Sequence, residues 1–256
     1  MPEHSSFLTL LMAHIRETLD HNAHGILGES IVGHQSPTWQ SYEPLFGSLL
    51  VILIVLGVAL RVRSRLQKAD EAVIPEEDLT LRTFMEAFLA YFYDLAKSVM
   101  DNERAKKYFP LIGTAAVFVF FSNVMALIPG MPIATSNLSI TLGCALVVFI
   151  LFNIYGVATN GWGYIAHLAG PAWYLWPLVF PIEVISLCVR PVTLAVRLMI
   201  NMTADHMMLG LFLGLIGLLV PVPVMLLGVV VVIVQTLVFT LLTCIYIGLA
   251  TEHEAH

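Results

Sequence analysis

Long apolar stretches separated by short polar ones dominate the chain. About 20 apolar residues cross the hydrocarbon core of a bilayer once, and the candidates for membrane-embedded helices are 45–60, 109–128, about 138–157, 176–220 and 224–250. The fourth stretch is too long to cross once upright, so we expect it to be strongly tilted or broken. The pattern predicts an all-α integral membrane protein with about five membrane-embedded helical segments, the fourth long and strongly tilted.

A further stretch has a different pattern. Residues 81–100 carry apolar side chains at helical spacing, interleaved with Arg82, Glu86, Asp94 and Lys97. Charged side chains are costly inside the hydrocarbon, whereas an amphipathic helix on the membrane surface keeps its polar face in water. The stretch is therefore predicted to be an amphipathic interfacial helix rather than another crossing.

The residues after the first apolar stretch indicate its orientation. The sequence RVRSRLQK at 61–68 contains four Arg or Lys residues, and such basic segments stay on the cytoplasmic side of a membrane. The N-terminus is therefore expected outside, and an odd number of crossings places the C-terminus in the cytoplasm. We expect residues 1–44 to be an external N-terminal segment and residues 45–256 to be one polytopic membrane domain.

Composition supports the membrane class and narrows the partners. Residues of the set AVILMFWYC make up 58% of the chain and charged residues 12%, whereas soluble domains average about 45–50% and about 25%. The mean hydropathy is +0.86. Because the net charge is −6 and the chain has no basic patch, nucleic acid is not expected as a partner.

No residue pattern indicates a metal or a cofactor. The five histidines of the N-terminal segment have spacings that fit no standard metal site: His4, His14, His21, His24 and His34. The three cysteines lie inside apolar stretches without paired spacing, as small buried side chains do. We therefore predict no cofactor and no metal.

The fourth apolar stretch carries polar side chains on one face. Six of them advance by four, three, four, four and four residues: Ser186, Arg190, Thr193, Arg197, Asn201 and Asp205. At about 100° per residue they form one stripe, the polar stripe, on an otherwise apolar helix, and His206 points roughly opposite to Arg197. An arginine at the centre of a lipid-buried helix costs at least ~2.5–3.5 kcal/mol, so such residues usually face protein or water and serve a function.

The sequence around the polar stripe resembles a known family. The segment PVTLAVRLMINMTADH is similar to the signature of subunit a of F-type ATP synthases, with matches at Pro191, Leu194, Arg197, Leu198, Asn201 and Met202. Further matches follow the same order along the chain, at Asn123, Pro129, Glu183, Gln235 and Tyr246. The likeness covers most of the chain from about residue 45 to the end.

The resemblance implies a non-catalytic stator subunit of the bacterial inner membrane, with residues 45–256 as its channel domain. In that family the subunit is the stator half of a proton channel, and its partners are a rotating ring of c subunits and the peripheral-stalk b subunits. Each c subunit carries a mid-membrane carboxylate, which Arg197 would attract in its ionised form while blocking a direct proton path. Arginine suits this role because it stays protonated and donates through a rigid fork.

Groups on either side of Arg197 are candidates for two half-channels. Glu183 lies about 21 Å before Arg197 along the helix and His206 about 13–14 Å after it, at 1.5 Å per residue. Glu183 has a second interpretation, in which it neutralises Arg190 on nearly the same face. The two interpretations are compatible.

The outer half-channel departs from the family pattern. Many bacterial members have a glutamate at the position of His206 and a histidine, glutamate or small residue opposite on the last helix, where this chain has Gly228. The resemblance therefore implies an outer half-channel built on His206, Asp205 and water. A histidine satisfied by a neighbouring hydrogen bond is the structural alternative for His206.

Three amides complete the candidate site. Asn201 belongs to the matched core and to the polar stripe. Gln235 is expected to orient Arg197 through a hydrogen bond or to serve packing alone. Asn123 is expected either to line the channel or to make an interhelical hydrogen bond.

A different function class remains open from the residues alone. A self-contained secondary transporter would bind an anionic solute through Glu183, Arg190, Arg197 and Asp205. The chain lacks the extended internal repeat that is typical of inverted-repeat transporters. The choice between protons and sodium ions depends mainly on the ring, which is another chain.

Overall fold

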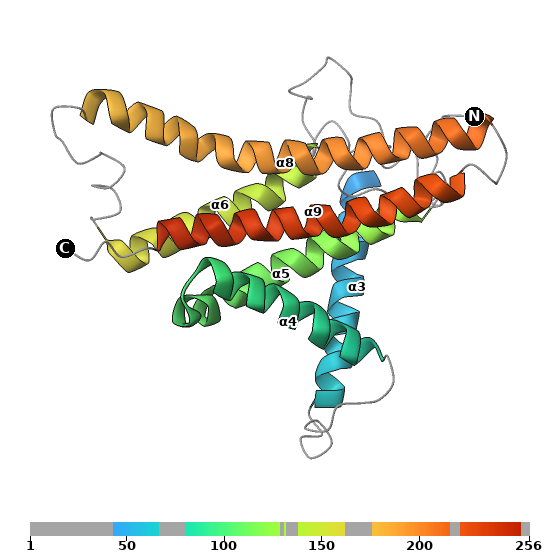
Figure 1. The fold of residues 1–256 in the computed structure, drawn as a ribbon, viewed down its shortest axis with the longest axis horizontal. Helices are drawn as coiled ribbons and strands as arrows, with labels where there is room; N and C mark the ends of the chain where they lie inside the picture. Colours follow the sequence, from blue (N-terminus) through green and yellow to red (C-terminus); the bar gives the residue numbers. More distant parts are fainter. Residues whose placement is uncertain are drawn as a thin grey trace, which may run out of the picture.

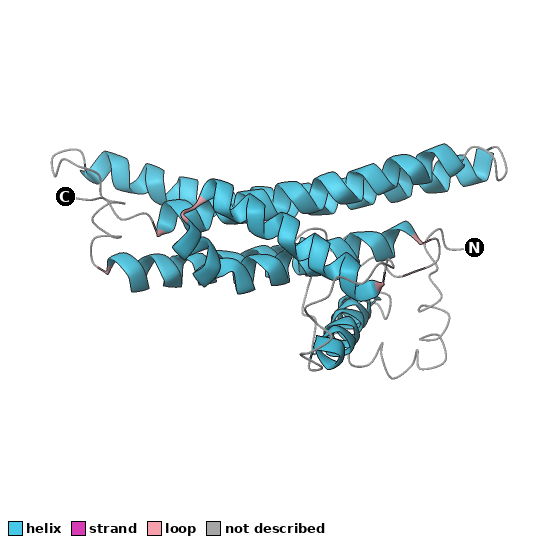
Figure 2. Cartoon of the chain, turned by 60° about the horizontal axis from the view of Figure 1, so that its bottom comes forward, coloured by secondary structure: helices cyan, strands magenta, loops and turns pink. Residues whose placement is uncertain are grey.

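The computed structural model describes residues 43–66, 80–128, 131, 138–161, 176–215 and 221–251. Within these ranges the chain forms six helices and no strand: α3 (Glu43–Leu66), α4 (Leu81–Val99), α5 (Asn102–Leu127), α6 (Leu138–Asn160), α8 (Trp176–Leu215) and α9 (Pro221–Ala250). Figure 2 shows this all-helical architecture. Most of the expected external segment 1–44 lies outside the described residues, so its structure stays a prediction.

Five of the described helices are long and apolar enough to cross a membrane. Their candidate spans are Leu45–Ser64, Asn102–Leu127, Leu138–Thr159, Val179–Asp205 and Met225–Ala250. The predicted class, an all-α membrane protein with about five embedded helices, is confirmed. The chain is a multi-pass membrane protein.

The fourth membrane-embedded segment is one unbroken helix. Helix α8 has 40 residues and continues through Pro181 and Pro191, so it is about 60 Å long, twice the ~30 Å thickness of the hydrocarbon core. Of the two expectations for this stretch, tilted or broken, the break is wrong for residues 176–215. Its tilt relative to a membrane stays a prediction, and residues 216–220 lie outside the described ranges.

The two longest helices lie against each other. Figure 1 shows α8 and α9 running lengthwise side by side, with α5 and α6 packed against this pair and α3 crossing at a steep angle. Core clusters give the register, because Leu187 shares a buried cluster with Ile247, Leu198 shares one with Phe239, and Met202 shares one with Val232. Residue numbers increase along α8 while those of the matching residues on α9 decrease, so the two helices are antiparallel.

Helix α4 is present where the amphipathic pattern predicted it. The side chain of Thr80 caps its N-terminus by accepting a hydrogen bond from the backbone N–H of Thr83. The helix packs against α5 and α9 and buries Met85 and Phe92, whereas Tyr91 stays exposed. Its position at a membrane interface stays a prediction.

Two predicted boundaries are corrected. Helix α5 begins at Asn102 rather than at 109, so the basic residues before the apolar run already belong to the helix. Helix α9 begins at Pro221 rather than at 224. Proline is tolerated in the first helical turn because the N–H that it lacks has no intrahelical partner there.

Candidate functional site

The polar stripe divides into an exposed part and a part that faces α9. Leu194, Leu198 and Met202 are buried and define the packed face of α8. Because steps of four residues advance about 40° beyond a full turn, the stripe drifts toward that face from Arg197 to Asp205. Arg197 is accordingly exposed, whereas Asn201 and Asp205 are half-buried.

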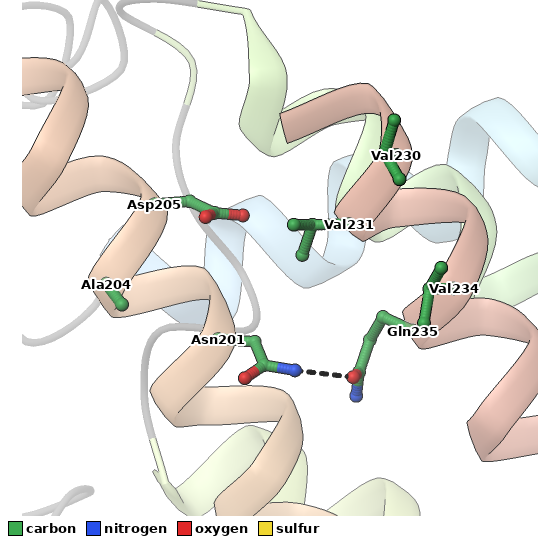
Figure 3. Close-up of a pocket in the computed structure, with 7 residues that line it drawn as sticks. All are labelled: Asn201, Ala204, Asp205, Val230, Val231, Val234 and Gln235. Carbon is green, nitrogen blue, oxygen red and sulfur yellow. Dashed lines mark hydrogen bonds between the residues drawn. The ribbon is translucent and has the colours of Figure 1, made fainter. Parts of the chain in front are cut away.

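A hydrogen bond joins the stripe to α9 one turn beyond Arg197. The amide nitrogen of Asn201 donates to Oε1 of Gln235 at 2.7 Å, as Figure 3 shows. Gln235 is buried, and a buried amide requires a partner. The expectation that Gln235 orients Arg197 is not met in the described contacts, because the partner of Gln235 is Asn201 instead.

A pocket of about 280 Å³ lies between α8 and α9 next to this hydrogen bond. Its lining residues are Asn201, Ala204, Asp205, Val230, Val231, Val234 and Gln235. The carboxylate of Asp205 reaches from α8 toward α9 (Figure 3). Because Val230 and Val234 are exposed, the pocket opens at the surface of this chain. Its volume and the polar side chains of Asn201, Asp205 and Gln235 allow it to hold water.

Arg197 presents an uncompensated charge to the surroundings of the chain. Its neighbours Ala195 and Leu198 are fully buried and fix the backbone of α8 at this point. The Arg197 side chain is exposed and makes no hydrogen bond or ion pair with any residue that the structure describes. The geometry therefore leaves this guanidinium available to an anion outside the chain.

Glu183 and Arg190 form an ion pair on the N-terminal half of α8. Nη2 of Arg190 lies 3.8 Å from Oε1 of Glu183. The guanidinium carbon of Arg190 lies 5.4 Å from the centre of the Tyr246 ring on α9. The neutralisation of Arg190 by Glu183 is therefore present, and a part-exposed pair of this kind contributes little to stability.

Asn123 lies inside the bundle without a partner for its side chain among the described residues. It is fully buried, and neither Nδ2 nor Oδ1 has a hydrogen bond. Its neighbours on α5 belong to buried clusters that include residues of α8 and α9, since Val119 shares a cluster with Leu198 and Phe239, and Ala126 shares one with Met202 and Val232. The expected interhelical hydrogen bond is absent within the described ranges.

Ser122 was not among the residues that the sequence pointed to. It is buried next to Asn123, and its hydroxyl also lacks a partner in the described part of the chain. The only signal in the sequence was a Ser–Asn pair inside an apolar run. The threonines of α9 differ, because the hydroxyls of Thr236 and Thr240 donate to backbone carbonyls four residues earlier.

The backbone of His206 lies in α8, but its side chain is outside the described part, so its orientation stays a prediction. On α9, Gly228 is buried, and a Cβ at this position would lie 3.4 Å from Cδ1 of Leu127 on α5. The position opposite His206 in the family pattern thus lies next to Leu127 of α5, at ordinary van der Waals distance. Among the described residues, no three His, Cys, Asp or Glu side chains gather at one point that suits a metal.

Comparisons with known proteins agree with this architecture. Residues 45–248 match the family model described as ATP synthase A chain. The ATP synthase subunit a of Sorangium cellulosum is 57% identical over 256 residues, which cover 100% of both chains. ATP synthase subunit a 1 of Syntrophotalea carbinolica is 42% identical over 207 residues, 81% of this chain and 84% of the relative.

A third relative gives the same result. The ATP synthase subunit a of Geobacter sulfurreducens is 43% identical over 176 residues, 69% of this chain and 76% of the relative. The family match covers most of the chain, and the helices that carry the polar stripe and Gln235 lie inside it. The chain therefore belongs to the subunit a family of ATP synthases, a component of the membrane sector of the complex.

Proposed function

We propose that this chain is the stator half of the proton channel of an F-type ATP synthase. It passes protons through two half-channels to and from the carboxylates of a rotating c-ring, and so couples ion flow to ATP synthesis. The observation that carries the proposal is Arg197, an exposed guanidinium on a membrane helix with no partner among the described residues.

The role of Arg197 follows from the cost of moving charge through lipid. A protonated carboxyl can rotate through hydrocarbon, whereas an ionised one cannot without a large desolvation cost. A fixed arginine pairs with the ionised form at the stator and, because it stays protonated, does not pass a proton onward. Each proton that follows the two half-channels supplies about 2.3 kcal/mol per 100 mV of membrane potential.

Residues before Arg197 on α8 serve one half-channel. Glu183 is half-buried and lies about 21 Å from Arg197 along the helix. A carboxylate at this position can accept and release protons next to the path of the ring. Its ion pair with Arg190 is compatible with that role.

Residues beyond Arg197 serve the outer half-channel. The pocket with Asn201, Asp205 and Gln235 offers a carboxylate and two amides to water. Asn123 extends the polar region toward α5, since water is the remaining partner for a buried amide, and His206 relays protons at the far end. The position opposite His206 is Gly228, which has no side chain, so the titratable groups of this half-channel come from α8.

The assembly follows from the same proposal. The apolar side chains exposed beside Arg197, such as Ile200, contact the c-ring and lipid, and the peripheral-stalk b subunits hold the chain in place. The protein resides in the bacterial inner membrane with its N-terminus outside and its C-terminus in the cytoplasm. It catalyses no reaction itself.

The test replaces Arg197 by lysine in the assembled complex. Arg197→Lys should abolish ATP-driven proton pumping in inverted membrane vesicles, because a desolvated lysine can lose its proton. The matched control is Arg61→Lys, which changes an exposed arginine on α3 and should pump normally. Normal pumping by Arg197→Lys, in complexes that retain the c-ring, would contradict the proposal.

Purification and reconstitution distinguish the proposed function from the alternative, a self-contained secondary transporter. A proton-channel stator copurifies with a ring of c subunits and loses pumping when a carbodiimide modifies the ring carboxyl. A self-contained transporter for an anionic solute moves that solute when this chain alone is reconstituted in vesicles. Solute uptake by the isolated chain would favour the rival.

A further inference from the structure

The polar stripe carries two arginines on nearly the same face of α8. Arg190 and Arg197 are seven residues apart, about 20° around the helix and about 10.5 Å along it. Both are long enough to reach an anion that approaches this face. A rotor carboxylate that paired with Arg190 would stop short of Arg197, so a second available guanidinium on the stripe would interfere with the proposed function.

The contacts of the two arginines are different. Arg190 lies within 3.8 Å of the Glu183 carboxylate and 5.4 Å from the centre of the Tyr246 ring. Its side chain is 24% exposed. Arg197 has neither kind of contact with the described residues and is exposed.

The Tyr246 ring belongs to a packed part of the bundle. It packs against the buried cluster that contains Cys244, Ile247 and Phe152, and its centroid lies 6.1 Å from that of the Phe152 ring on α6. A guanidinium stacks on an aromatic face through the charge distribution of the ring. A ring held in this way fixes the guanidinium against α9.

We propose that Tyr246 and Glu183 together sequester Arg190, so that Arg197 is the arginine of the stripe that receives the rotor carboxylate. The inference rests on the proposed function and adds a specificity-determining residue, Tyr246, to it. Glu183 neutralises the charge of Arg190. The aromatic ring of Tyr246 holds the guanidinium of Arg190 away from the path of the rotor carboxylates.

The experiment separates sequestration from simple packing by a second-site change. Tyr246→Leu removes the aromatic face and should slow ATP-driven proton pumping about threefold, because the released Arg190 competes for the rotor carboxylate. Tyr246→Phe keeps the ring and should pump at the normal rate. Tyr246→Leu combined with Arg190→Gln should recover most of the rate, because the competing charge is gone.

A packing role predicts the opposite for the double variant. If Tyr246 serves only to fill space, Arg190→Gln does not restore the rate of Tyr246→Leu, and that result overturns the inference. A normal rate for Tyr246→Leu alone overturns it as well. If the leucine variant fails to assemble with the c-ring, Tyr246→Met, which fills similar space without an aromatic face, takes its place in the same comparison.

The outcome is distinct from a failure of the proposed function. Arg197→Lys is measured in parallel, and normal pumping by that variant would remove the channel role itself. Loss of pumping in Arg197→Lys without recovery in the double variant would leave the channel role intact and overturn sequestration alone.

Discussion

Arg190 and Arg197 carry the same charge on the same stripe, yet their surroundings are different. Arg190 lies between a carboxylate on its own helix and an aromatic ring on α9. Arg197 is exposed and has no hydrogen bond or ion pair with a described residue. The difference teaches that a membrane helix can present one arginine and withhold another through its neighbours across the helix pair, without a change in residue type.

The regions around the two arginines also differ in polarity. Around Arg190 the neighbouring helices contribute a tightly packed cluster with aromatic rings, including Phe152 and Tyr246. Beyond Arg197 a pocket lined in part by Asn201, Asp205 and Gln235 lies between the two helices. We expect changes on the pocket side to affect proton flow more than changes around Arg190.

The largest effect is expected when Arg197 is replaced by alanine, and the matching change at Arg190 is the comparison. Arg197→Ala should abolish ATP-driven acidification of inverted vesicles and raise passive proton permeability, because the charge that blocks a direct path is lost. Arg190→Ala should keep pumping within about threefold of normal, since a part-exposed ion pair contributes little. Equal losses in the two variants, in membranes with equal amounts of assembled complex, would remove the distinction between them.

The next largest effect is expected at His206. An imidazole changes its charge near neutral pH and is a natural proton relay, so His206→Ala should slow proton flow about tenfold or more without a leak. His206→Glu should retain more flow because it restores a titratable group. Acidification of inverted vesicles from pH 6 to 9 measures both variants, with Met207→Ala as the neighbouring control. A full rate with alanine would end the relay hypothesis.

A smaller effect is expected from the amide pair. Gln235→Leu leaves the half-buried Asn201 amide unsatisfied, at a cost of about 1–3 kcal/mol, and should lower the melting temperature of the complex. Asn201→Leu combined with Gln235→Leu should recover that stability, because loss of both partners leaves no unpaired group. Pumping should remain slow in both variants. Recovery of pumping together with stability would reduce the pair to a structural contact.

The smallest effect is expected at Asn123. Asn123→Leu replaces an amide that has no partner among the described residues, so thermal stability should be unchanged or higher. Proton pumping should fall about threefold because a buried amide that binds water is lost. Thr240→Val is the control, since the hydroxyl of Thr240 bonds within its own helix. Lower stability with normal pumping in Asn123→Leu would contradict a channel role.

The membrane helices and the helix that carries the site could be predicted from the sequence. The length of apolar runs predicted the membrane helices, and the described helices begin and end near those runs, with the largest difference at Asn102, seven residues before its run. Charge next to an apolar run and proline near its start blur a boundary, because both are compatible with a first helical turn. The spacing of the polar stripe likewise pointed to α8 as the helix that carries the site.

The spacing of polar residues along one helix does not identify their hydrogen-bond partners on the neighbouring helix. The sequence suggested that Gln235 would orient Arg197, whereas it accepts a hydrogen bond from Asn201, 34 residues away. A shift of one helical turn between α8 and α9 decides which of these two stripe residues faces Gln235. Ser122 was missed for the same reason, since its burial depends on the packing of α5 against its neighbours.

The sequence by itself determined the membrane class, the number of long apolar helices, the polar stripe and the family to which the chain belongs. The membrane class, the helices and the polar stripe follow from local periodicity and run length, which depend on neighbouring residues alone. The family follows instead from motif matches at positions such as Arg197 and Asn201. The tertiary structure decided that α8 continues unbroken, that Asn201 pairs with Gln235, and that Arg190 rests against Tyr246 while Arg197 stays exposed. Those outcomes depend on the register and the drift of one helix face against another, which residue spacing along a single helix does not specify.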